Sequence, residues 1–181
     1  MTATGIFKRS DRVFRPWKNG GGETAEIAVS PLGADFENFD WRISTAVVAA
    51  SGPFSAFPGV DRVLTVLEGG AMVLSVGEEK RRLDAVCEPF SFPGDVPAAA
   101  LLEGGRLLDF NVMVRRPLRA DVLRGPLAPG RRGVDEHVRL ALLLEDRAGL
   151  ARFDLVNLAA AAPSLVATLA GAQVLDVCIS G

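Results

Sequence analysis

The sequence predicts an all-β protein built from antiparallel, jelly-roll-type barrels with little helix. Apolar and polar residues alternate with a period of two, which is the period of a strand and not of a helix. The 181 residues include 19 glycines and 11 prolines, which separate many short runs of strand character. No long amphipathic helical pattern is present. A sandwich or barrel of short antiparallel strands is therefore expected.

The first half of the chain contains the clearest strands. Residues 40–49 place Trp41 and Ile43 on one face and Arg42 and Ser44 on the other. Gly69-Gly70 separates two apolar runs and predicts a tight hairpin turn, because glycine readily adopts a positive φ. The strands expected here, in chain order, are 24–29, 40–49, 62–67, 71–76, 80–84, 89–92 and 106–115.

Residues 117–133 are rich in proline, glycine and arginine, and we expect them to connect two sets of strands. The strands expected after them are 134–144, 152–158, 165–169 and 174–179, with a short helix within 138–150 as an alternative to strand. The chain is thus expected to be one compact unit over 1–181. Its first set of strands lies in about 1–116, and a second, shorter set lies in about 117–181.

Composition and charge exclude several function classes. Lys and Arg number 20 against 22 Asp and Glu, a net charge of −2, so no basic excess is available for nucleic acid or an anionic membrane. Residues 155–175 are uncharged, but alanine and Pro163-Ser164 favour strands and turns over a membrane span. Charged residues stand where a secretory signal needs an apolar core, so a cytoplasmic protein is expected.

Histidine and cysteine are scarce. A tight transition-metal site usually needs three or four His, Cys or carboxylate ligands, and the chain has one histidine, His137, and two cysteines, Cys87 and Cys178. We therefore expect no metal and no cofactor, and we expect His137 to be exposed. The cysteines are interpreted as reduced, buried, apolar residues, with a disulfide between them as the alternative.

The most unusual stretch surrounds three consecutive glycines. Lys18 and Asn19 precede Gly20, Gly21 and Gly22. Such a run costs backbone entropy, and it either lets backbone amides approach an anion or lets a strand cross a barrel corner. The sequence favours the second interpretation modestly and matches no nucleotide-binding motif.

Three strands pair an apolar face with a face of polar and small residues. The polar faces carry Thr24, Glu26 and Ala28; Arg42, Ser44 and Ala46; and Asp109, Asn111 and Met113. These faces are either solvated outer faces or the lining of a hydrated barrel interior. In the second case Phe54 and Phe57 would close a barrel end, and Arg62 would turn inward.

An inward polar face predicts a site for a small carboxylate. Arg42, Lys18 and Arg62 would supply positive charge, which suits an anion that arginine can bind bidentately. Glu26 would pair with Arg42 and limit that charge. We expect Asn19, Thr24, Ser44 and Asn111 to orient the ligand, and Gly20, Gly21 and Gly22 to let the backbone approach it.

Several motifs occur in order between about residues 6 and 117 and together resemble the HutD/Ves family. They are Pro16–Ile27, Trp41–Ser44, Gly52–Ser55, Phe57–Gly59, Asp61-Arg62 and Asp109–Arg116. The resemblance implies a cupin-superfamily fold in a bicupin arrangement. It also implies a role in regulating histidine utilisation, through a small acidic intermediate such as N-formylglutamate, or in a stress response. The histidine-rich motif of metal-binding cupins is missing from this sequence.

Three functions remain open from the sequence. The first is a non-enzymatic protein that binds a small acidic metabolite. The second is a metal-independent isomerase or hydrolase acting on such a metabolite, with Glu26 as general base. The third is an interaction or structural module, whose partner would be a regulator or a second copy in a homodimer.

Overall fold

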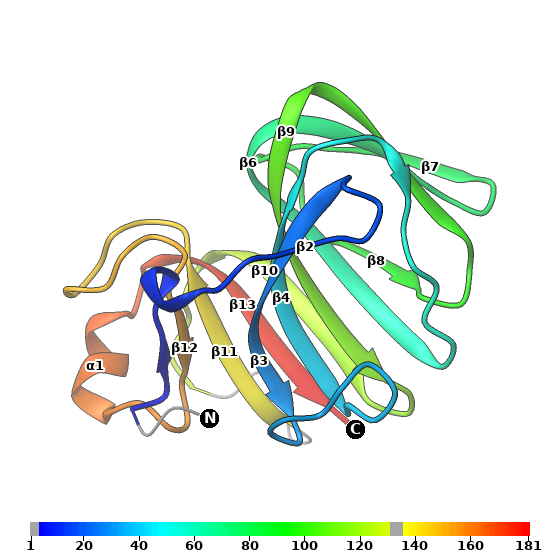
Figure 1. Cartoon of the computed structure of the whole chain (residues 1–181). Coiled ribbons are helices and arrows are strands. Elements are labelled where there is room, and N and C mark those ends of the chain that lie inside the picture. The colour runs from blue at the N-terminus through cyan, green and yellow to red at the C-terminus, as the bar shows by residue number, and fades with distance from the viewer. Residues whose placement is uncertain (1–3, 131–135) are drawn as a thin grey trace. The chain divides into compact units, whose positions relative to one another are not determined.

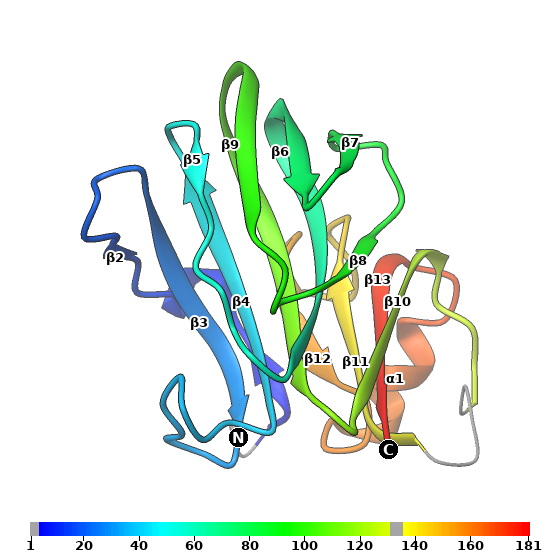
Figure 2. The ribbon, with the colours of Figure 1, turned by 90° about the vertical axis from the view of Figure 1, so that its right-hand side faces the viewer.

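The computed structural model describes residues 4–130 and 136–181, and the chain divides into two compact units (Figures 1 and 2). The central unit comprises Val13–Arg116. The terminal unit comprises the N-terminal residues up to Arg12 together with Pro117–Gly181. Antiparallel strands dominate both units, and the helices of the described residues are short. The expected all-β, antiparallel fold class is confirmed.

The central unit is one eight-stranded antiparallel sheet. Its path is β2-β3-β4-β9-β6-β7, and β5 pairs with β9 while β8 pairs with β6. The strands are β2 (Arg15–Pro16), β3 (Gly22–Ser30), β4 (Trp41–Val48), β5 (Gly52–Pro53), β6 (Val60–Val76), β7 (Glu79–Leu83), β8 (Phe90–Pro93) and β9 (Ala98–Arg115). The alternation of apolar and polar residues therefore predicts most of these strands correctly.

The long strands β6 and β9 pair with each other along most of their length, and their two halves have different neighbours. β4 and β8 flank the half that contains Arg62 and Met113. β5 and β7 flank the half that contains Leu74 and Ala100. Figure 2 shows β5 and β7 beside the upper parts of β9 and β6. The sheet thus divides into two parts that share the same two central strands.

The predicted hairpin turn at Gly69-Gly70 is wrong. β6 continues through both glycines, and its register with β9 shifts on either side of Gly69. A Cβ at Gly69 would lie 2.5 Å from the carbonyl oxygen of Arg106, and one at Gly70 would lie 2.7 Å from that of Gly105. The glycines allow two backbones to approach closely where the paired strands bend.

An apolar cluster fills the interior of the central unit. β6 contributes Leu64 and Val66 from one half and Met72 and Leu74 from the other, and all four side chains are buried. The further buried members are Val48, Val76, Leu83, Phe92, Ala98, Ala100 and Leu107. Because both halves of β6 bury side chains in this cluster, the bend in the sheet encloses it.

The terminal unit is a five-stranded antiparallel sheet in the order β1-β12-β11-β13-β10. Its elements are β1 (Ile6–Phe7), the 3-10 helix η1 (Arg9–Asp11), β10 (Arg119–Pro126), β11 (Glu136–Leu143), β12 (Leu155–Asn157), α1 (Pro163–Thr168) and β13 (Gln173–Ser180). The N-terminal strand β1 belongs here because Ile6 and Phe7 pair with β12. Alternating residues of β11 and β13, such as Leu143 and Val174, enter its apolar cluster.

One buried ion pair joins the central strands of the terminal sheet. Arg139 Nε donates to Asp176 Oδ1 at 3.0 Å, and Arg139 Nη2 donates to Asp176 Oδ2 at 2.7 Å. The same guanidinium donates to the carbonyl oxygens of Ala128 and Gly130. All three nitrogens of the Arg139 guanidinium therefore have acceptors. Such pairing and hydrogen bonding reduce the free-energy cost of burying a charge.

Three further expectations for the second half need correction. Residues 165–169 fall largely in helix α1 and not in a strand, because Pro163 stands at the first turn of the helix, where its missing N–H costs nothing. Residues 119–126 form β10 inside the expected connection. The alternative helix within 138–150 is wrong because residues 138–143 continue β11. Residues 131–135, which include the start of the strand expected from 134, lie outside the described residues.

The uncharged stretch 155–175 is divided among β12, α1 and β13. Among the described residues, no helix is long and apolar enough to cross a membrane. Cys87 and Cys178 are both free thiols, so the disulfide alternative is wrong.

Candidate functional site

Three rows of directly paired residues cross the strands β3, β4, β9 and β6 of the central unit. Successive rows lie two residues apart along β4, β9 and β6, and on β3 a bulge adds one residue between the first two rows, so the side chains of the rows point to the same side of the sheet. We call this side the polar face. In strand order its rows are Val29, Arg42, Met113 and Arg62; then Glu26, Ser44, Asn111 and Leu64; then Thr24, Ala46, Asp109 and Val66.

The polar face is buried at Arg42, Ser44, Arg62 and Asp109, whereas Glu26 on β3 is exposed. Leu64 and Val66, which stand in the same rows, belong to the apolar cluster. The interpretation of a solvated outer face is therefore wrong for Arg42 and Ser44 on β4 and for Asp109 on β9, and these polar groups share the interior with hydrocarbon.

One detail of the expected polar face is wrong. A bulge between Glu26 and Ala28 shifts the register of β3, so Ala28 pairs with Ile43 and leaves the row pattern of Glu26. A bulge places an extra residue on one strand, which a strict period of two cannot anticipate.

Arg62 is a buried cation held among aromatic rings. Its guanidinium carbon lies 5.0 Å from the ring centre of Phe92, 5.4 Å from Phe54 and 5.7 Å from Phe57. Its side chain makes no ion pair with any described residue, and Nε has no hydrogen-bond partner there. Desolvation lowers the pKa of Arg62 to about 10, although Asp109 acts to raise it. Arg62 thus remains charged near neutral pH with unused hydrogen-bond donors.

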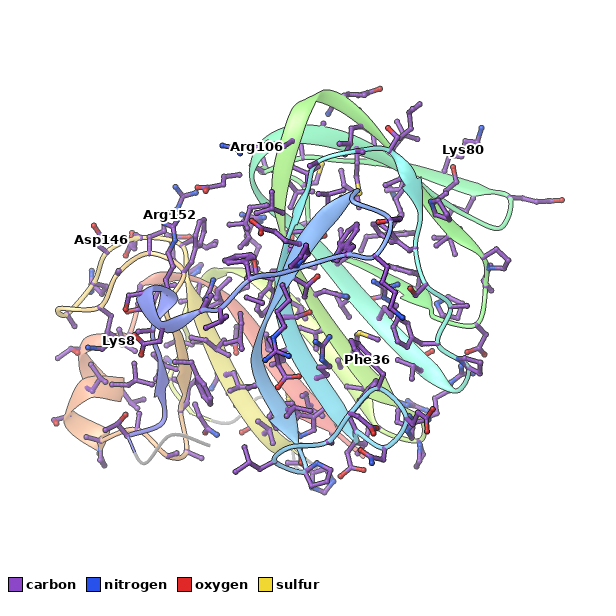
Figure 3. The ribbon with its side chains drawn as sticks, viewed as in Figure 1. Lys8, Phe36, Lys80, Arg106, Asp146 and Arg152 are labelled. Carbon is purple, nitrogen blue, oxygen red and sulfur yellow. The ribbon has the colours of Figure 1, made fainter. Side chains whose placement is uncertain are left out.

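Arg42, the second arginine of the face, has partners. Its Nε donates to Glu26 Oε2 at 3.0 Å, and its guanidinium carbon lies 4.3 Å from the ring centre of Phe36. Phe36 stacks on Phe57 with ring centres 5.7 Å apart, and Phe57 in turn contacts Arg62 (Phe36 is labelled in Figure 3). Phe36 is 53% exposed and the Glu26 side chain 43% exposed, so they mark the part of the site nearest solvent.

Two oxygen atoms of the face also have no partner. Asp109 Oδ1 and Asn111 Oδ1 are buried without a hydrogen bond to any described residue. Desolvation raises the pKa of Asp109 to about 7, while Arg62 and the backbone amide of Ala46 act to lower it. The alternation in the sequence places Asp109 on the polar face, but Asp109 is not among the predicted site residues.

The glycine run forms the turn between β2 and β3, away from the two arginines. Lys18, Asn19 and Gly20 are exposed there. Gly20 N donates to the carbonyl oxygen of Trp17, and Gly21 N donates to Asn19 Oδ1. Gly22 pairs with Val48 on β4, and Val48 lies six residue steps from Arg42, roughly 20 Å at the rise of a strand. The structure therefore does not bring Lys18, Asn19 and the glycines together with Arg42 and Arg62.

Gly22 is required by close packing. A Cβ there would lie 2.4 Å from the carbonyl oxygen of Val47 and 3.1 Å from the ring of Trp17. Trp17 is fixed by a hydrogen bond from its Nε1 to Thr24 Oγ1 at 2.7 Å. Thr24 is thus engaged in holding Trp17, and the close approach of the Val47 backbone and the Trp17 ring explains why a glycine stands at position 22.

We expect Gly22→Ala to lower the free energy of unfolding by about 1–3 kcal/mol, because the new methyl group overlaps a backbone oxygen that cannot move freely. Urea denaturation measures the change. Gly21→Ala is the matched control: the nearest atom to its Cβ is Asn19 Oδ1 at 3.3 Å, which belongs to an exposed side chain. Equal losses in the two variants would contradict this account of Gly22.

Two further expectations concern histidine and metal ligands. His137 is exposed, as expected, and its Nε2 lies 2.9 Å from the carbonyl oxygen of Gly181. Within the residues that the structure describes, no three His, Cys, Asp or Glu side chains gather in a way that could hold a metal ion.

Comparisons with known proteins agree with the motifs in the sequence. The HutD family model matches residues 9–165. HutD from Pseudomonas fluorescens SBW25, solved in a formate condition, is 33% identical; the match covers 97% of this chain and 92% of that one, with a TM-score of 0.71. A conserved protein of unknown function from Pseudomonas aeruginosa PAO1 is 31% identical over 96% of this chain and 95% of that one, with a TM-score of 0.69.

Protein Ves from Cronobacter sakazakii is 46% identical over 101 residues, which cover 55% of this chain and 54% of that protein. The match therefore spans about half the length of this curated relative, whereas the family model and the solved HutD structure extend over most of the chain. On this evidence the chain belongs to the HutD family.

Proposed function

We propose that this protein binds a small carboxylate on the polar face of its central unit, with Arg62 as the main anchor. The observation that carries the proposal is the state of Arg62: a buried guanidinium with no ion pair among the described residues and a free Nε. A buried cation without a counter-charge is costly, and a carboxylate supplies both the charge and the acceptors.

The surroundings of Arg62 support an anion over a neutral ligand. The row contains two guanidinium groups, Arg42 and Arg62. Glu26 forms an ion pair with Arg42 and neutralises its charge. Among the described residues, Asp109 is the acid whose charge acts on Arg62, and its raised pKa leaves it only partly ionised near neutral pH. Ser44 and Asn111 in the middle row supply polar atoms for orientation.

We further propose a candidate ligand for this carboxylate site. The family resemblance implies a small acidic intermediate such as N-formylglutamate and a regulatory role in histidine utilisation. N-formylglutamate has carboxylates for Arg62, so it is the first compound to examine. In this proposal the protein binds such a metabolite and does not catalyse its conversion.

Isothermal titration calorimetry with N-formylglutamate, glutamate, urocanate and histidine tests the proposal. We expect binding of at least one carboxylate to weaken by about 30-fold or more in Arg62→Met, since a buried charge contact is lost. Arg81→Met is the matched control, because Arg81 also lies over a ring, that of Phe90 at 5.4 Å, but is exposed. It should bind like the wild type.

Two outcomes would overturn the proposal: no binding of any of these compounds to the wild type, or equal affinity in the wild type and Arg62→Met. Consumption of the bound compound during the titration would favour the enzyme hypothesis over simple binding. Thermal unfolding of Arg62→Met controls for folding, and we expect no loss of stability because the substitution removes a desolvated charge.

A further inference from the structure

The polar face presents buried acceptors as well as a buried cation. Asp109 is 3% exposed and its Oδ1 has no hydrogen-bond partner in the described part of the chain; the same holds for Oδ1 of Asn111. The carbonyl oxygen of Asp109 accepts from Thr45 Oγ1 at 2.6 Å. The backbone amide of Ala46 acts on the carboxyl group, but Oδ1 has no hydrogen-bond partner among the described residues. Buried oxygen atoms without donors are rare in folded proteins and call for a physical reason.

The acceptors and the cation stand in a fixed order. Asp109 and Asn111 are two residues apart on β9, so their side chains point the same way at a spacing of about 7 Å. Met113, the next residue in this alternation, pairs directly with Arg62. A ligand whose carboxylate meets Arg62 therefore extends past Asn111 toward Asp109.

Among the described residues, the side chains paired with Asp109 and Asn111 offer no donor to these two oxygens. Leu64 pairs with Asn111 and Val66 pairs with Asp109 on the β6 side, and both belong to the apolar cluster. On the β4 side, Asp109 pairs with Ala46. The side chains in these positions leave the acceptors to a group that comes from outside the chain.

We infer that Asp109 and Asn111 accept hydrogen bonds from an N–H group of the same ligand whose carboxylate binds Arg62. The site would thus select carboxylates that carry an N–H donor, such as N-acyl amino acids, over carboxylates of similar shape that lack one. This inference rests on the proposed carboxylate binding. A site with unpaired buried acceptors rejects a ligand that has no donor, because the acceptors then stay desolvated and unsatisfied.

The experiment compares two ligands that differ only in the donor. N-acetylglutamate carries an amide N–H, and 2-acetoxyglutarate has an ester oxygen in its place. Calorimetry at pH 8 measures both affinities in the wild type, Asp109→Asn and Asn111→Leu. We expect the wild type to prefer the amide by about tenfold or more, since one hydrogen bond to a charged acceptor is at stake. Each variant should reduce this preference to about threefold or less.

Asp61→Asn is the matched control, because Asp61 neighbours Arg62 on β6 but points to the opposite side of the strand. It should keep the preference of the wild type. A merely structural role for Asp109 or Asn111 would weaken both ligands equally and leave the ratio of affinities unchanged.

The outcomes separate the two proposals. Equal binding of amide and ester by the wild type, lost for both in Arg62→Met, would overturn the inference and leave carboxylate binding intact. Failure of the wild type to bind these two ligands and the four compounds named above would overturn both. A preference that persists unchanged in Asp109→Asn and in Asn111→Leu would also overturn the inference.

Discussion

Replacing Asp176 by leucine is expected to lower the free energy of unfolding by about 3–5 kcal/mol, because it leaves the guanidinium of Arg139 buried without its counter-charge. Both side chains of this pair are buried, and two of their hydrogen bonds are to each other. Burial makes the loss large, since water cannot replace the missing carboxylate. Chemical denaturation of the wild type and the variant measures it.

The double variant Arg139→Met/Asp176→Leu distinguishes two contributions: the loss of the attraction between the two side chains, and the cost of leaving Arg139 buried without a counter-charge. It removes the cation together with the anion, so we expect it to be more stable than Asp176→Leu alone. Glu103→Ala provides the surface comparison. It breaks the exposed 3.0 Å pair with Arg82 and should cost less than about 1 kcal/mol. A loss in Asp176→Leu no larger than in Glu103→Ala would show that the buried pair is not what stabilises this sheet.

The strands of the central unit follow from the sequence where the information is local. The alternation in residues 40–49 predicts β4 because a period of two fixes which neighbours share a face. At Gly69-Gly70 the same reasoning fails. Two adjacent glycines permit either a turn or a close approach, and the deciding feature is the backbone of Arg106 and Gly105 on a distant strand. Tertiary partners of this kind are not encoded in a local pattern.

The candidate site likewise depends partly on local sequence pattern and partly on tertiary contacts. Alternation places Arg42, Ser44 and Asn111 on polar faces, but it does not say that β4, β9 and β6 lie side by side or that this side is buried. The charge of Lys18 fits a carboxylate site, but Lys18 lies at an exposed turn. Asp109 could have been found from Leu107 and Met113, the buried apolar residues on its own side of β9, since an acid on such a side of a central strand needs a special reason.

The burial of Asp109 predicts a second large effect. The variant Asp109→Asn should be more stable than the wild type at pH 8 and nearly equal to it at pH 4. In the folded protein the pKa of Asp109 is raised by burial from 3.8 to about 7. Between these values the unfolded chain releases a proton that the folded chain keeps, so stability falls as pH rises through this window. A shift of about three pKa units corresponds to about 4 kcal/mol above pH 7.

Urea denaturation of the two proteins from pH 4 to pH 8 measures the effect as a difference, because all other titrating groups are shared. A difference that stays constant over this range would mean that Asp109 ionises normally and already has a donor, and the proposed N–H selectivity would then lose its basis. A difference that grows with pH would mean that the fold without ligand carries the cost of a desolvated carboxylate beside Arg62. A ligand that brings a donor to Asp109 relieves that cost, so its stabilising effect should be larger in the wild type than in Asp109→Asn at pH 8.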